Sequence, residues 1–128
     1  DIFGFCVNVK LPNDIFISGE KVCGILCETG ISGDKVDYAI IGIGVNVAVC
    51  INSLPSEIKD ICGTLLDPDH IYASEAREVL FVFFLRKFSL FYRQFISGDF
   101  LGILQSVKKY CGAYEMEDLI LELERRLH

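Results

Sequence analysis

Residues 14–28, DIFISGEKVCGILCE, decide the first half of the fold. Asp14–Ile17 and Lys21–Glu28 read as two strands, and Ser18-Gly19 reads as the turn between them. A two-residue turn at that point predicts a β-hairpin in which Phe16 faces Lys21. The chain therefore starts with antiparallel strands.

The two charged residues Asp14 and Lys21 form either a surface ion pair or part of a site. The predicted register puts Asp14 opposite Cys23, so that Asp14 and Lys21 are diagonal neighbours on one face. Their backbones would then be roughly 7–8 Å apart, a gap that a lysine side chain can span. Gly24 falls on the opposite face in this register. The pattern alone leaves both interpretations open.

Two further segments read as strands. Residues 2–10 alternate and end at a Leu11-Pro12-Asn13 break, because proline removes a backbone donor. After a looser turn over residues 30–34, residues 38–49 form a long β-rich run that contains Gly42 and Gly44. Glycine inside a strand marks close approach of a backbone or a ligand, or simply packing beneath a helix. Asn46 lies among apolar residues in this run, so its amide must find partners.

The second half reads as helices. A short helix is expected from Pro55 to about Cys62, and a long one starts at an N-cap Ser74 and ends near Ser97-Gly98. Asp99 caps a further helix, and residues 115–127 form a last one whose acidic side chains are expected to be solvated. The phenylalanines of the long helix are expected to be core residues: Phe81, Phe83, Phe84, Phe88, Phe91 and Phe95. Strands followed by helices indicate an α+β fold, with a mixed or antiparallel sheet packed by helices.

Composition narrows the class of protein. The chain has 128 residues, 52% of them hydrophobic and 23% charged, which predicts one globular domain and excludes disorder. Its net charge of −6 disfavours nucleic acid as a partner, and its densest apolar run, residues 79–85, is too short to span a membrane. Six cysteines without a CxxC pair, and two histidines, make a metal site unexpected. We expect reduced cysteines and a cytoplasmic protein.

Three motifs together resemble one family. Residues 10–14 (KLPND), then Lys21 at the head of KVCGILCE, then residues 40–47 (IIGIGVNV) are similar to the catalytic domain of biotin protein ligases. The family usually has Trp at the position of Leu11, and Leu-Ala at the position of Val22-Cys23; both changes are apolar for apolar. The resemblance covers about residues 1–110. It implies the synthetase-like fold of biotin and lipoate ligases.

The resemblance also implies an activity and a set of roles. Such enzymes activate biotin with ATP and Mg²⁺ to biotinyl-5′-AMP and pass biotin to a lysine of a biotin carboxyl carrier protein. A cation must bring the biotin carboxylate to a phosphate, and Lys21 matches the lysine that does so. The other matched positions follow by role: catalytic, Asp14 and Lys10; biotin-binding, Gly24, Leu26 and Gly42 with Lys21; nucleotide-binding, Asn13, Val45 and Asn46.

Several expectations concern the extent of the chain. The family's Gly-Arg-rich loop and its small C-terminal barrel have no counterpart here, so residues 1–112 are expected to be the C-terminal two-thirds of a catalytic domain. Residues 113–128 would stand in place of the barrel as a C-terminal helix. No DNA-binding domain is expected, and a homodimer stays open. The alternatives are a non-catalytic binding or dimerisation module of this fold, or a lipoate ligase.

Overall fold

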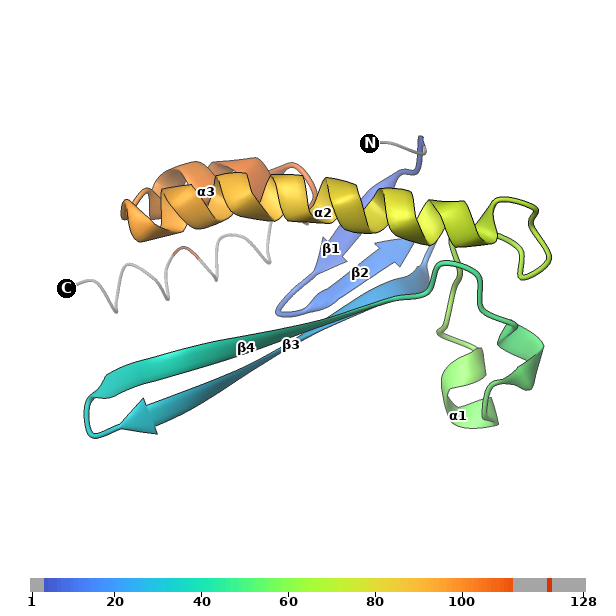
Figure 1. Cartoon of the computed structure of the whole chain (residues 1–128). Coiled ribbons are helices and arrows are strands. Elements are labelled where there is room, and N and C mark those ends of the chain that lie inside the picture. The colour runs from blue at the N-terminus through green and yellow to red at the C-terminus, as the bar shows by residue number, and fades with distance from the viewer. Residues whose placement is uncertain (1–3, 112–119, 121–128) are drawn as a thin grey trace.

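The fold is a four-stranded antiparallel sheet crossed by a long helix (Figure 1). The computed structural model describes residues 4–111 and 120. The strands lie side by side in chain order, each antiparallel to the next: β1 (Val7–Lys10), β2 (Asp14–Ile17), β3 (Glu20–Ser32) and β4 (Lys35–Val45). The predicted α+β class is confirmed, while the synthetase-like assignment stays a prediction. No helix among the described residues has the length and apolarity needed to cross a bilayer.

The turn between β2 and β3 is the predicted two-residue turn. Ser18 and Gly19 both have positive φ, 53° and 87°, which is the geometry that suits the twist of a tight hairpin. Phe16 pairs with Lys21, as predicted. The hairpin is therefore set by two residues in the left-handed region, where glycine at position 19 costs least.

Beyond the two pairs next to the turn, Ile17 with Glu20 and Phe16 with Lys21, the predicted register of the hairpin is wrong. A β-bulge shifts the pairing between Ile15 and Phe16, so that Asp14 faces Gly24 instead of Cys23. The extra residue on the bulged strand interrupts the alternation of faces. As a result Gly24 lies on the same face as Asp14, not on the opposite face. The turn predicted only the two pairs next to it, because the bulge adds its extra residue beyond those pairs.

The β3–β4 hairpin is longer and differently placed than the sequence predicted. β3 runs to Ser32, and the turn is confined to Gly33-Asp34, so residues 30–32 are strand. β4 starts at Lys35 and ends at Val45, short of the predicted residue 49. In Figure 1 these two strands extend well past β1 and β2 as a two-stranded ribbon.

The helices follow the sheet. They are η1 (Ile51–Ser53), α1 (Ser56–Lys59), α2 (Ala73–Ile96) and α3 (Phe100–Lys108). The predicted Ser74 cap is wrong: α2 starts at Ala73, two residues earlier than a cap at Ser74 implies, and Tyr72 occupies the N-cap position without a side-chain cap. The Asp99 cap is confirmed, since Gly102 N donates to Asp99 Oδ1 at 3.0 Å. The predicted helix over residues 115–127 lies outside the described residues, save Ile120.

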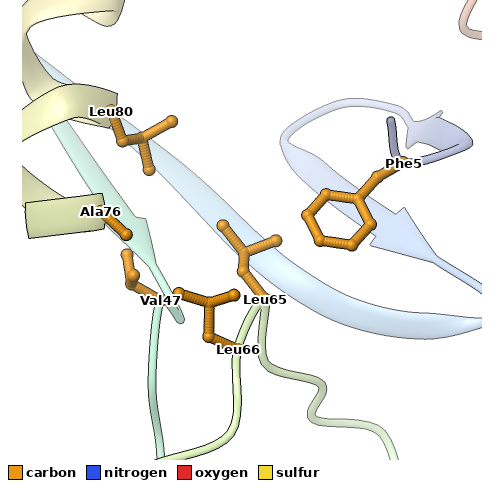
Figure 2. Close-up of a pocket in the computed structure, with 6 residues that line it drawn as sticks. All are labelled: Phe5, Val47, Leu65, Leu66, Ala76 and Leu80. Carbon is orange, nitrogen blue, oxygen red and sulfur yellow. The ribbon is translucent and has the colours of Figure 1, made fainter. Parts of the chain in front are cut away.

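The core lies where α2 crosses the root of the sheet. The buried apolar residues are Val22, Cys23, Val47 and Ala76. Figure 2 shows Val47 close to Ala76 of α2, with Phe5 on the other side of a small apolar cavity of about 10 Å³. Further along α2, an open apolar groove of about 920 Å³ lies between the helix and the sheet.

The expectation that the phenylalanines of α2 are core is wrong for most of them. Phe81 is 61% exposed and Phe95 56%, and only Phe84 falls below the exposed class. These residues are spread around the helix, and one sheet face can cover one side of a helix only. Phe81, Phe84 and Phe88 line the open groove between α2 and the sheet, so even this side of the helix is only partly covered.

Candidate functional site

The site candidate lies on the sheet face that α2 does not cover. Cross-strand partners share a face, so the register groups six of the predicted residues there. We call this surface the Lys21 face; it consists of Lys10, Asp14, Lys21, Gly24, Leu26 and Gly42. The α2 face carries instead the alternate residues of the same strands, such as Ile15, Cys23 and Ile43, which line the apolar groove.

An ion pair forms the centre of the Lys21 face. Lys21 Nζ lies 2.6 Å from Asp14 Oδ1, and the two side chains are 35% and 24% exposed. This separation is that of a charge-assisted hydrogen bond, which holds the ammonium in a defined direction while leaving part of it accessible. The predicted proximity of these two residues is confirmed, and they are diagonal neighbours, because Lys21 pairs with Phe16, two residues from Asp14.

Gly24 leaves space directly beside this ion pair. A Cβ at position 24 would lie 3.4 Å from Lys21 Cε, 3.5 Å from Lys21 Nζ and 3.7 Å from Asp14 Oδ1. Glycine therefore keeps the approach to the ammonium open. Across the ladder, Gly24 pairs with Gly44 and Leu26 with Gly42, so the surface beside the ion pair carries few side chains. A ligand carboxylate or phosphate could reach Lys21 Nζ over this bare backbone.

Lys10 and Asn13 frame the other side of the ion pair. Lys10 pairs with Asp14 across the β1–β2 ladder, and its ammonium lies 5.7 Å from the centre of the Phe16 ring. Asn13 is exposed in the turn before β2, where its carbonyl accepts a hydrogen bond from Ile25 N at 2.8 Å. Lys10, across the ladder, and Asn13, next along the chain, are thus two more polar residues close to Asp14.

The structure does not bring Val45 to this face. Val45 pairs with Cys23 and lines the apolar groove under α2, on the opposite side of the sheet from Gly24. Asn46 follows at the end of β4, and its amide is held inside the chain: Nδ2 lies 3.0 Å from Gly63 O and 3.3 Å from Lys21 O. The predicted nucleotide contacts at these two positions stay predictions.

Cys23 lies beside the ion pair but on the buried side. Burial raises the pKa of its thiol above the ordinary 9.0, the charge of Asp14 raises it further, and that of Lys21 lowers it. The side chain is 5% exposed. A buried thiol with a raised pKa is a packing residue rather than a nucleophile.

The described residues do not offer a metal site of their own. Within residues 4–111 no three His, Cys, Asp or Glu side chains come together. The carboxylate nearest the centre, Asp14, is already paired with Lys21.

The sequence did not predict one feature of this site, the contact of residues 61–63 with Lys21. Only the position of Asn46 among apolar residues pointed toward it.

Comparison with known proteins finds a matching family profile and several relatives. Residues 3–46 match the sequence profile of the Biotin/lipoate A/B protein ligase family. The chain is 47% identical over 62 residues to "Bifunctional ligase/repressor BirA" of Bacillus subtilis (strain 168), covering 48% of this chain and 19% of that protein.

Two other relatives agree. "Biotin--protein ligase 2" of Arabidopsis thaliana is 32% identical over 102 residues, 76% of this chain and 28% of that protein. "Biotin--[acetyl-CoA-carboxylase] ligase" of Paracoccus denitrificans is 50% identical over 40 residues, 31% of this chain and 17% of that protein. The matches thus span between 17% and 28% of these relatives. Residues 3–46 thus match the profile of the biotin/lipoate A/B protein ligase family, and the chain is similar to proteins named as biotin ligases.

Proposed function

We propose that the full protein is an ATP-dependent biotin ligase, which forms biotinyl-5′-AMP and transfers biotin to a lysine of a biotin carboxyl carrier protein. The observation that carries the proposal is the Lys21–Asp14 pair, 2.6 Å apart, beside the space left by Gly24. The names of the relatives support biotin as the acid. A cytoplasmic setting is part of the proposal.

Lys21 supplies the electrostatic part of the first step. The carboxylate of biotin attacks the α-phosphate of ATP, and pyrophosphate leaves. Two anions must meet, and a compact ammonium between them lowers the energy of the charge that develops. Asp14 keeps Lys21 Nζ in place by accepting its hydrogen bond. In the second step the carrier's amine attacks the acyl carbon and AMP leaves; Asp14 is placed to take the amine's proton.

The two glycines and Leu26 are proposed to form the biotin side of the surface. Gly24 and Gly42 leave backbone uncovered on adjacent strands, and Leu26, 60% exposed, supplies an apolar wall next to Gly42. Magnesium is not assigned to side chains of residues 4–111, because no three His, Cys, Asp or Glu side chains come together there. It would arrive on the phosphates of ATP, as the ion commonly does.

Biotin-dependent exchange of pyrophosphate into ATP tests the first step. In the full protein, Lys21→Ala should lower the exchange rate by about 10²–10³, the loss seen when one charge-stabilising donor is removed. Lys35→Ala, which removes the same charge from the exposed start of β4, is the matched control and should exchange normally.

Three outcomes separate the candidate functions. Native exchange by Lys21→Ala overturns the proposed role. Because the family profile covers both acids, lipoate is offered in place of biotin, and exchange with lipoate alone would make the protein a lipoate ligase. Ligand binding without exchange by the native protein would indicate a non-catalytic module.

A further inference from the structure

The sequence of β4 is that of an interior strand, although β4 lies at the edge of the sheet. Residues 38–45 (YAIIGIGV) contain no charged residue and no proline, and the residues on both faces of this stretch are apolar. Strands that are buried on both faces have such continuous apolar runs, whereas natural edge strands carry charges, prolines or bulges that prevent further pairing. The apolar run therefore predicts a neighbour on each side of β4.

The hydrogen bonds to β3 show which backbone groups of β4 are left over. Asn46 N donates to Val22 O at 2.8 Å, so the even-numbered residues at this end of β4 turn their N–H groups toward β3. The odd-numbered residues, such as Ile41 and Ile43, turn theirs to the outer edge. No strand among the described residues lies beside that edge.

One face of β4 is open along the same stretch as its edge. Ile41, Ile43 and Val45 line the apolar groove of about 920 Å³ on the α2 face, and Ile41 is 48% exposed. An open edge and an open groove at the same residues point to one missing piece of chain that covers both. The matched regions make up only 17% to 28% of the relatives, so these relatives have several times more chain than aligns here.

We propose that in the full protein a strand from outside these 128 residues pairs with the outer edge of β4 and closes that side of the Lys21 face. Residues opposite each other on neighbouring strands have Cβ atoms about 4.5–5.5 Å apart, so the partners of Gly42 and Gly44 stand directly beside these glycines. The space there is open among the described residues, since a Cβ at position 44 would meet only Gly24 O, at 3.9 Å. The side chains of the added strand thus form a wall of the acid pocket beside the Lys21–Asp14 pair. The wall rests on the proposed function, whereas the strand does not.

Amide hydrogen exchange in the full protein tests the strand. Isoleucine amides labelled with ¹⁵N give matched probes: Ile41 and Ile43 point to the outer edge, Ile25 N donates to Asn13 O at 2.8 Å, and Ile71 lies in a turn with its side chain 78% exposed. We expect Ile41 and Ile43 to exchange at least about a hundredfold more slowly than Ile71 and within about tenfold of Ile25, because a hydrogen-bonded amide exchanges only after it opens. Exchange of Ile41 and Ile43 as fast as that of Ile71 would overturn the inference.

NOEs from the amide proton of Ile43 identify the partner strand. We expect NOEs to residues of the same chain outside the 128. NOEs to residues within the 128, or to a second copy in a sample that mixes labelled and unlabelled protein, would overturn the inference.

Added biotin tests whether the strand is a wall of the pocket. Biotin should shift the resonances of the residues opposite Gly42 and Gly44 more than those of their neighbours in the strand, which point to the α2 face. Unshifted resonances in a protein that binds biotin would refute the wall. Slow exchange at Ile43 in a protein that neither binds biotin nor exchanges pyrophosphate would refute the proposed function and leave the strand in place.

Discussion

Replacing Gly24 by alanine should separate stability from activity. The added methyl would make ordinary contacts with its neighbours, 3.4 Å from Lys21 Cε and 3.7 Å from Asp14 Oδ1, and position 24 has no positive φ. Alanine also restricts the unfolded chain, so the free energy of unfolding should stay equal or rise by about 0.4–1 kcal/mol. On the Lys21 face, however, the methyl occupies the space through which a ligand would approach the ammonium.

The loss of ligand binding can be estimated from overpacking. One extra methyl group in a filled space costs about 1–3 kcal/mol. At 1.4 kcal/mol for each factor of ten, this is roughly a 5- to 150-fold weaker affinity. We expect Gly24→Ala to raise the KM for biotin in pyrophosphate exchange by a factor in this range, while its urea midpoint does not fall.

The control lies on the same strand. Cys27 is exposed and three residues further along β3, where the alternation puts its side chain on the other face. Cys27→Ala should leave both the KM and the urea midpoint close to native values. A Gly24→Ala protein with native KM would refute a ligand beside the ion pair, and one that loses stability along with activity would refute the geometry derived for position 24.

Two other predictions concern the fold. Gly19→Ala should lower the free energy of unfolding by about 1–2 kcal/mol, because residue 19 has φ of 87°. Ser18→Asn should not lower it, since asparagine suits this turn. Urea denaturation compares the two variants, and equal stability of Gly19→Ala and the native protein would contradict the turn assignment. Cys23 has a raised pKa, so its contribution to stability is present below about pH 9, the unfolded value, and is lost as pH rises above it. The free energy of unfolding should therefore fall less between pH 8 and pH 10 in Cys23→Ala than in the native protein. In the native protein, iodoacetamide should label the exposed Cys6 and Cys27 before Cys23. Prompt labelling of Cys23 would contradict its burial.

Local chemistry made part of the fold predictable. Ser18-Gly19 specified a tight turn, and the pairing of Phe16 with Lys21 followed from it. The bulge that puts Asp14 opposite Gly24 could not be predicted, because the pattern of apolar residues does not show where β3 carries the extra residue of the bulge. The sequence therefore predicted that Asp14 and Lys21 lie together, but not that Gly24 joins them.

Long-range contacts set the limit for the rest. The end of β4 at Val45 depends on residues 61–65 taking the hydrogen bonds next to Asn46 and Lys21, and no local pattern encodes that partnership. The exposed phenylalanines of α2 show a related limit, since helical spacing tells which residues share a side but not whether another layer covers that side.

The ribbon of β3 and β4 has two ends of unequal strength. At its root, near Lys21, the strands are bordered by β2 and by residues 61–63, whereas past Ile25 the backbone hydrogen bonds among the described residues join β3 to β4 alone. Backbone amides near Gly33 can thus open and exchange with deuterium in small local steps, while those near Val22 open only when several segments separate together. Local opening that begins at the Gly33-Asp34 turn should therefore leave the strands around Lys21 intact.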